Sequence, residues 1–178
     1  QDRYGHLWVG TLGGMSRYDG EHFTNYNVRN GMLDNSCNAI VTDKQGNIWL
    51  GGREGLSKYN GRTFEHFRLQ LPEDNNPQAV KKIIAAADNS LWCHTDKAVY
   101  EVQGNSIRPV ALPDTGITIT ALLPEGNNLW VATNNGRIYK RTGKQWDSIF
   151  YNFPGLPKAP LRTTHIFRDS KKRLLLTT

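Results

Sequence analysis

The sequence predicts an all-β protein, a β-propeller fragment of four-stranded antiparallel blades that amounts to about four blades. Three observations predict this fold. A motif centred on Trp returns along the chain about every 40 residues, a period typical of propeller blades. Short alternating runs of apolar and polar residues lie between the motifs, and Gly or Pro separates them about every 8 to 12 residues. We find no capped segment with a helical period.

The Trp motif sets the phase of the repeat. Its copies are Leu7-Trp8-Val9-Gly10-Thr11, Ile48-Trp49-Leu50-Gly51-Gly52, Leu91-Trp92-Cys93-His94-Thr95, Leu129-Trp130-Val131-Ala132-Thr133 and, without Trp, Leu174-Leu175-Leu176-Thr177-Thr178. Asp2, Asp43 and Asp169 stand at the same distance before the Trp position. A repeated apolar position belongs to the core, so we expect Trp8, Trp49, Trp92 and Trp130 to fill the gaps between blades and not to stack on a ligand.

The second unit shows how each blade is built. Residues 39–42, 48–50, 56–59 and 63–67 are expected to form its four strands. Asp43-Lys44-Gln45-Gly46 predicts a hairpin turn in which Asp accepts backbone N–H groups and Gly takes a positive φ. Asn60-Gly61 is a second hairpin signal. One such sheet cannot bury both of its faces, so neighbouring blades are expected to stack face to face.

The same register divides the whole chain. Residues 1–30 are expected to form a partial blade, residues 34–70, 78–112 and 116–153 three full blades, and residues 162–178 another partial blade. The chain starts and stops inside repeats, which would leave open blade edges prone to aggregation. We therefore expect it to be a fragment of a longer propeller.

The charge and the composition of the chain argue against some classes of function. Lys and Arg outnumber Asp and Glu by 22 to 16, a net charge of +6, but the basic residues are scattered over turns and strands. We interpret most of them as a solvated face, with attraction of anionic sugars as the functional alternative. There is no nucleic-acid-binding signature and no apolar run long enough to span a membrane. The segment is therefore expected to contact neither nucleic acid nor membrane.

No motif for catalysis stands out. The histidines form no zinc-binding pair, and Gly10 to Gly14 is glycine-rich but precedes no helix that could cradle a phosphate. Cys37 and Cys93 have no metal or redox spacing. We interpret Asp43 and Asp169 as turn residues and not as an acid–base pair. The sequence thus predicts a segment without catalytic residues, metal ligands or a cofactor.

The first two units carry a more specific pattern. Asp2, Gly5, Leu7-Trp8-Val9-Gly10-Thr11, Gly14-Met15, Tyr18-Asp19-Gly20, Phe23 and Tyr26 are followed by Gly31-Met32-Leu33 and Asn35, and the unit from Asp43 to Phe67 repeats the pattern. This pattern resembles the two-component regulator propeller repeat, found in the periplasmic sensor regions of hybrid two-component systems of glycan-degrading bacteria. The third and fourth units keep the Trp but lose the Gly-Thr and Tyr-Asp-Gly parts.

The resemblance implies a function. Propellers and a small β-sandwich would lie in the periplasm, joined through a transmembrane helix to a histidine kinase, a receiver domain and a DNA-binding domain. An oligosaccharide, neutral or anionic, would bind outside the inner membrane and switch on polysaccharide-utilisation genes. This segment would not itself be an enzyme, because the histidine kinase activity would lie elsewhere in the parent chain.

Loops that lead into the inner strands of a propeller are the expected place for a ligand. Paired polar groups on such loops would suit the hydroxyl groups of a sugar. In the predicted register these loops carry Arg29, Asn35, Asn38, Gln78, Lys81, Arg162 and His165. The alternative interpretation, which is the more common one for any single residue of this kind, is an ordinary polar loop residue.

Two other functions stay open. Streptogramin-type lyases use similar Trp- and Gly-containing propeller repeats together with a metal and a catalytic His; His94 and His165 are the starting points here, and no acidic partner for a metal is evident. The other alternative is a protein-interaction scaffold. Two copies of the chain could cover each other's open blade edges, so we expect self-association.

Overall fold

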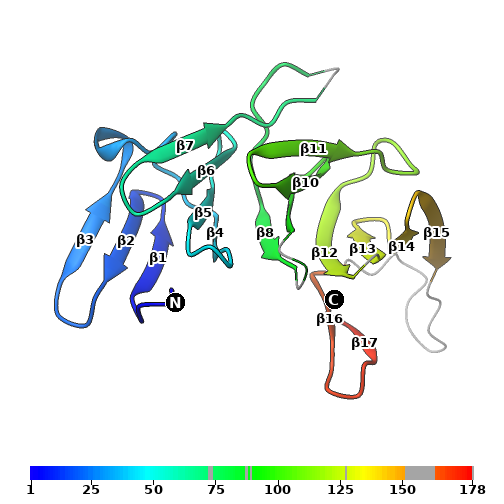
Figure 1. Ribbon diagram of the computed structural model, residues 1–178. Helices are drawn as coiled ribbons and strands as arrows, with labels where there is room; N and C mark the ends of the chain where they lie inside the picture. The colour runs from blue at the N-terminus through cyan, green and yellow to red at the C-terminus, as the bar shows by residue number, and fades with distance from the viewer. Residues whose placement is uncertain (72–73, 87, 89, 127, 151–162, 178) are drawn as a thin grey trace.

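A computed structural model of the chain describes residues 1–71, 74–86, 88, 90–126, 128–150 and 163–177. The protein is all-β, as predicted: these residues form five antiparallel sheets and, within the described ranges, one short 3-10 helix. The sheets follow one another along the chain and stand side by side (Figure 1). In every sheet each strand is hydrogen-bonded to the strand that follows it in the sequence, which is the arrangement of propeller blades.

The sheets contain four strands in the three middle units. The first sheet is formed by β1 (Leu7–Thr11), β2 (Gly14–Tyr18) and β3 (Phe23–Tyr26), with the 3-10 helix η1 (Val28–Asn30) after it; the second by β4 (Ala39–Thr42), β5 (Ile48–Gly51), β6 (Leu56–Tyr59) and β7 (Phe64–Phe67); the third by β8 (Lys82–Ala85), β9 (Leu91–His94), β10 (Val99–Gln103) and β11 (Ser106–Val110); the fourth by β12 (Ile119–Glu125), β13 (Asn128–Thr133), β14 (Arg137–Thr142) and β15 (Gln145–Phe150); and the fifth by β16 (His165–Arg168) and β17 (Leu174–Thr177).

The array has two distinct ends. The β3–β4, β7–β8 and β11–β12 connections lead from one sheet to the next and lie on the upper side of Figure 1; we call this the loop end. The β4–β5, β8–β9, β12–β13 and β16–β17 hairpin turns lie at the opposite end, which we call the turn end. The first strands of the sheets are neighbours, because β8 contacts both β4 and β12, and β12 contacts β16.

The predicted Asp turns are confirmed. Asp2, Asp43 and Asp169 each accept, through Oδ1, a hydrogen bond from the backbone N–H four residues later, at 3.0, 2.8 and 2.8 Å. The fourth residue of the turn has a positive φ, which is 88° at Gly46 and 60° at Lys172. An αL backbone is unfavourable for a residue with a Cβ, so the β16–β17 turn is a strained version of the turn that Gly makes elsewhere.

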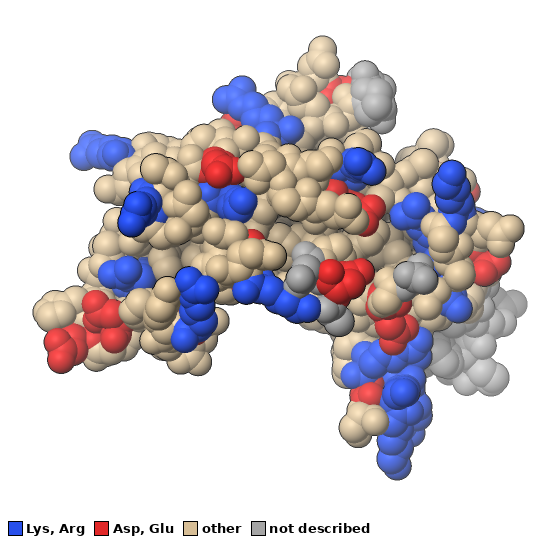
Figure 2. All heavy atoms as spheres, viewed as in Figure 1, with Lys and Arg blue, Asp and Glu red and all other residues tan. Residues whose placement is uncertain are grey.

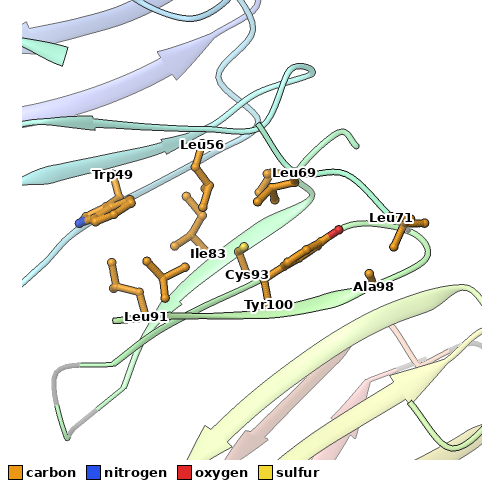
Figure 3. Packing of buried hydrophobic residues seen from close by; sticks show 11 residues of the cluster. Trp49, Leu56, Leu69, Leu71, Ile83, Leu91, Cys93, Ala98 and Tyr100 are labelled. Atoms are coloured by element: carbon orange, nitrogen blue, oxygen red, sulfur yellow. The ribbon is translucent and has the colours of Figure 1, made fainter. Parts of the chain in front are cut away.

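The repeated Trp residues lie between neighbouring sheets. Trp49, Trp92 and Trp130 are 2%, 8% and 7% exposed, and Trp8 is half-buried. Trp49 extends from the second sheet toward Leu91 of the third, and Leu56, Ile83, Cys93 and Tyr100 continue this cluster (Figure 3). Burying a large apolar side chain of this kind contributes about 2 to 3 kcal/mol. The sheets are thus held together mainly by the apolar faces that one blade alone could not bury.

Small residues after the Trp let the connections cross closely. A Cβ on Gly51 would overlap Cγ1 of Val80 in the β7–β8 connection, and a Cβ on Gly10 would overlap Sγ of Cys37. The backbone N–H of Val80 donates to the carbonyl oxygen of Gly52 at 2.9 Å. These contacts fasten each connection to the sheet before it and fix the geometry of the loop end.

Candidate functional site

The β3–β4 connection is held by its own side chains. Asn35 accepts a hydrogen bond from the backbone N–H of Val28 at 3.0 Å, and Asn27 caps η1 by accepting from the backbone N–H of Arg29 at 2.8 Å. Arg29 is exposed on η1. Of the two residues predicted here, Asn35 therefore supports the loop with its oxygen, while Arg29 presents its side chain to solvent.

The β7–β8 connection brings two of the predicted residues together. Nδ2 of Asn38 donates to the carbonyl oxygen of Val80 at 3.0 Å, next to Lys81. Nζ of Lys81 lies 2.9 Å from Oδ2 of Asp96, in the β9–β10 turn. Both partners of this ion pair are about half exposed, so it contributes little to stability and could exchange for contacts with a ligand.

The side chain of Gln78 is buried and forms hydrogen bonds within its own loop. It is 9% exposed, and its amide donates to Oδ2 of Asp74 at 3.2 Å and to the carbonyl oxygen of Asn76 at 3.0 Å. Oδ2 of Asp74 also accepts from Nζ of Lys97 at 3.3 Å. Hydrogen bonds from the backbone and side chain of Asn76, and then the one from Lys97, lower the pKa of Asp74. Gln78 thus orders the loop that carries Asp74. It would influence a ligand only indirectly, by holding Asp74 and, through Asp74, Lys97 in place.

His165 lies at the far side of the array from the β3–β4 connection. His165 is exposed at the start of β16, with Nδ1 3.2 Å from Oγ1 of Thr177. Arg162 lies outside the described residues. The structure therefore groups Asn38, Lys81 and the Gln78 network, and leaves Arg29 and His165 at separate places on the loop end.

A cavity opens at the loop end between the third sheet and the β11–β12 connection. Its volume is about 540 Å³, within the size range of small-molecule sites. The residues that line it are Leu71, Lys97, Ala98, Pro109, Val110, Ala111, Leu112, Asp114, Thr115, Gly116, Ile117 and Thr118. Apolar walls with a few polar groups are the usual composition of a binding site for a small organic ligand.

The β11–β12 connection, which forms one wall of the cavity, is held by hydrogen bonds with residues of the fourth blade. Asp114 accepts a hydrogen bond from the guanidinium of Arg137 at 2.9 Å and another from the hydroxyl of Tyr139. Burial, and then the bond to Asp114, raises the pKa of Tyr139. Oδ1 of Asn134 accepts from the backbone N–H of Thr118 at 3.1 Å. The carboxylate of Asp114 and the backbone at Thr118 are therefore held in place, and such preorganisation lowers the cost of binding.

Sequence reasoning missed this wall. The cavity residues Lys97, Asp114, Thr115 and Thr118 were not among the predicted ligand residues, although Pro113-Asp114-Thr115-Gly116 is a polar loop that leads into an inner strand. Applying the same rule to this loop would have found Asp114, Thr115 and Thr118. Lys97 lies in the β9–β10 turn, a type of loop that the rule does not cover.

The buried titratable groups do not form a reaction centre within the described residues. His94 is 3% exposed, and Nδ1 lies 2.9 Å from the carbonyl oxygen of Thr95. Burial is the main cause of its lowered pKa, to which Lys82 and Lys81 also contribute. Cys37 and Cys93 are free thiols, and burial raises the pKa of Cys93 to about 12. Among the described residues, no three His, Cys, Asp or Glu side chains gather where they could hold a metal ion.

Positive charge gathers elsewhere on the array. Figure 2 shows Lys and Arg side chains over the protruding β16–β17 hairpin, whose turn carries Lys171, Lys172 and Arg173. This hairpin points away from the loop end (Figure 1). The loop-end cavity, with Lys97 beside Asp74 and Arg137 beside Asp114, instead has balanced charge.

The fold and the repeat define the class of protein: the chain is an array of β-propeller blades. Residues 31–54 match the family model of the two component regulator propeller, so the resemblance seen in the residues of the second unit is confirmed. Comparison with curated proteins gives no match. Within the described residues, no helix has the length and apolar character needed to cross a membrane.

Several solved structures share the fold. The extracellular domain of the hybrid two-component system BT4673 from B. thetaiotaomicron is similar over 97% of this chain, with a TM-score of 0.80 and 21% identity. That of BT3049 from the same organism is similar over 99%, with a TM-score of 0.74 and 19% identity. The chain spans 25% of each of these structures. A catalytically inactive virginiamycin B lyase from Staphylococcus aureus, solved with quinupristin, is similar over 99% of this chain and 60% of its own, with a TM-score of 0.76 and 16% identity.

Proposed function

We propose that this chain is the ligand-sensing propeller segment of a hybrid two-component sensor and lies in the periplasm. Its ligand would be an oligosaccharide, and binding would signal to polysaccharide-utilisation genes through kinase and regulator domains elsewhere in the parent protein. The observation that carries this proposal is the loop-end cavity, which has the size of a small-ligand site and lies on a scaffold that contains a two-component regulator propeller repeat.

The chemistry of the cavity suits a sugar. The hydroxyl groups of Thr115 and Thr118 and the ammonium group of Lys97 can form hydrogen bonds with sugar hydroxyls, while Leu112 and Ile117 can contact the C–H face of a ring. Lys97 is 62% exposed and its bond to Asp74 is 3.3 Å long, so the ammonium group can turn to a ligand at little cost.

Thermal unfolding of this chain with a panel of neutral and acidic oligosaccharides tests the proposal. A ligand that binds only the folded state stabilises it by about 2.7 kcal/mol at 100 times its Kd, so one sugar should raise the melting temperature. Lys97→Met and Thr118→Val should reduce that rise. Lys171→Met, which removes an exposed Lys at the turn end, should leave it unchanged. An absence of any rise across the panel, or equal rises in all variants, would contradict the proposal.

A lyase is the second candidate, because the virginiamycin B lyase structure is similar over 99% of this chain. His94 is the residue to test, but its burial and its bond to Thr95 leave it poorly placed to meet a ligand. Incubating the chain with quinupristin and following the antibiotic by chromatography separates the two functions. Conversion that His94→Ala or His165→Ala abolishes would favour the lyase; unchanged antibiotic would favour the sensor.

A further inference from the structure

One position of the repeat carries charge in four sheets. It lies on the strand after the Trp, directly opposite the Trp in the register: Arg17 opposite Trp8, Lys58 opposite Trp49, Glu101 opposite Trp92 and Lys140 opposite Trp130. In three of these sheets the residue also faces an opposite charge on its other neighbouring strand: Glu65 for Lys58, Arg108 for Glu101 and Asp147 for Lys140. Arg17 instead faces the uncharged Thr24.

The guanidinium of Arg17 has few hydrogen-bond partners among the described residues. Its Nε is buried and has no hydrogen-bond acceptor among the described residues, and its Nη2 lies 3.5 Å from Oγ1 of Thr24, the outer limit for such a bond. Lys58, at the same place in the next sheet, has Nζ 3.0 Å from Oδ1 of Asn105 and 3.9 Å from Oε2 of Glu65. Since buried donors in proteins are nearly always paired, Arg17 calls for an acceptor from outside the chain.

A cavity of about 260 Å³ lies beside Arg17, between the first and second sheets at the turn end. Its lining includes a second guanidinium, that of Arg3, together with His6, Tyr59 and the amide side chains of Gln45 and Asn47. It is smaller than the loop-end cavity and lies at the opposite end of the array. Its size fits one charged group with a small part of the molecule that carries it.

One acidic residue, Asp2, also lines this cavity, but the oxygens of its carboxylate are already occupied. Oδ1 of Asp2 accepts from the backbone N–H groups of Tyr4 and His6, and its Oδ2 accepts from Nε1 of Trp8 and faces Nδ1 of His6. Asp19 is close enough for Arg17 to lower its pKa, but its bonds from the backbone of His22 and Glu21 are the larger causes. Neither carboxylate therefore supplies the acceptor that Nε of Arg17 lacks.

We propose that this cavity binds a carboxylate or sulfate group, with Arg17 as its principal ligand. The planar fork of a guanidinium matches either group in a bidentate geometry, and Arg3 adds a second positive charge at the cavity. The group would come from a free inorganic anion or from an acidic sugar. The proposal does not depend on the loop-end site, because the two cavities share no residue.

The test follows the side-chain Nε–Hε signal of Arg17 by NMR in the full chain. Sodium sulfate, sodium glucuronate and neutral glucose are added separately, each with sodium chloride to a constant ionic strength. Saturable movement of the Arg17 signal with sulfate or glucuronate, and none with glucose, is the expected result. Saturation by sulfate at the lower concentration would identify a site for free anions; saturation by glucuronate at the lower concentration would identify a site for acidic sugars.

Three variants make the test specific. Thr24→Glu gives Arg17 the counter-ion that Glu65 gives Lys58, so it should weaken anion binding at least tenfold while raising the melting temperature without anion. Arg17→Gln should abolish binding measured by calorimetry. Lys58→Gln, the matched change in the second sheet, should bind as the unmodified chain does. An Arg17 signal that moves with neither anion, or equal affinity in Arg17→Gln, would overturn the proposal.

Discussion

The indole N–H of Trp49 donates a 2.9 Å hydrogen bond to Oδ2 of Asp43, the residue that also closes the β4–β5 turn. The first sheet repeats this pair with Trp8 and Asp2 at 2.8 Å. Other oxygens take the place of Asp in the next two sheets: Oγ of Ser90 accepts from Trp92 at 2.9 Å, and Oε2 of Glu125 accepts from Trp130 at 3.2 Å. Each Trp that fills the gap between sheets is thus tied to an acceptor at the turn end of its own sheet.

Removing the acceptor should therefore destabilise the chain. Asp43→Ala leaves the buried indole N–H of Trp49 without a partner, and we expect the free energy of unfolding to fall by about 2 kcal/mol, as for other buried hydrogen bonds to charged groups. Asp19→Ala is the control, because Asp19 also accepts backbone N–H groups in a turn but binds no indole. Urea denaturation measures both. Equal losses in the two variants would show that the turn, and not the Trp–Asp pair, matters.

The crossing of Gly51 by Val80 predicts a steric effect. Gly51→Ala places a Cβ against Cγ1 of Val80, and we expect a loss of about 1 to 3 kcal/mol, as for other overpacked cores. Gly13→Ala meets only Oγ1 of Thr11 at 3.8 Å and should be tolerated. In the double variant Gly51→Ala/Val80→Ala the losses should be less than additive. Strict additivity in this double-mutant cycle would mean that the two residues do not touch.

His94 predicts a pH dependence of stability. Burial lowers its pKa below the ordinary value of 6.5, so the unfolded chain takes up a proton at this residue before the folded chain does. The free energy of unfolding should accordingly fall as the pH drops below about 6.5, by up to about 1.4 kcal/mol per pH unit. His94→Gln should remove this slope between about pH 7 and 5, above the range in which carboxylates titrate. Parallel pH profiles for the two proteins would contradict the assignment.

Arg168 should anchor the β16–β17 hairpin. Its Nε and Nη2 lie 2.8 and 2.9 Å from the two carboxylate oxygens of Glu125 on β12. Since the pair is partly exposed, Arg168→Ala should cost about 1 kcal/mol or less overall. Hydrogen exchange should become several-fold faster in β16 and β17 and stay unchanged in the second sheet. Arg173→Ala, which removes a pair inside the hairpin, is the control and should not detach it from β12.

The outer faces of the array predict self-association. Leu7 and Val9 on β1 are 48% and 47% exposed, and Phe167 and Leu175 on β16 and β17 are 42% and 36% exposed. The residues that correspond to Leu7 and Val9 in the second sheet, Ile48 and Leu50, are each 2% exposed under a neighbouring sheet. Analytical ultracentrifugation should show oligomers at high concentration that Leu7→Lys/Val9→Lys reduces. A strictly monomeric profile at every concentration would refute this.

The strands could be predicted from the sequence because the residues that determine them are close together in the chain. In the second unit the predicted strands agree with β4 to β7 to within one residue at each end. The Asp turns were also predicted correctly, since an Asp and a Gly within a few residues determine such a turn. The hydrogen bond between Asp43 and Trp49 was not foreseen, although the constant spacing of the two residues was the signal for it.

The candidate site was harder to predict because it depends on contacts between sheets. Asn38 donates to the carbonyl oxygen of Val80, 42 residues away, and nothing near Asn38 in the sequence indicates that its amide is used in this way. Gln78 is likewise occupied by Asp74 and Asn76 within its own loop. A polar side chain in a loop can bond to nearby backbone and support the loop instead of binding a ligand, and only the three-dimensional arrangement separates the two roles.

The measurement that tests the central claim most directly is an NMR titration of the ¹⁵N-labelled chain with the oligosaccharide panel. The account predicts that one sugar shifts the backbone signals of Lys97, Thr115 and Thr118, with saturation, while the signals of the β16–β17 turn stay in place. Shifts confined to other parts of the array, or no saturable shift with any sugar, would contradict the assignment of the loop-end cavity as the sensing site.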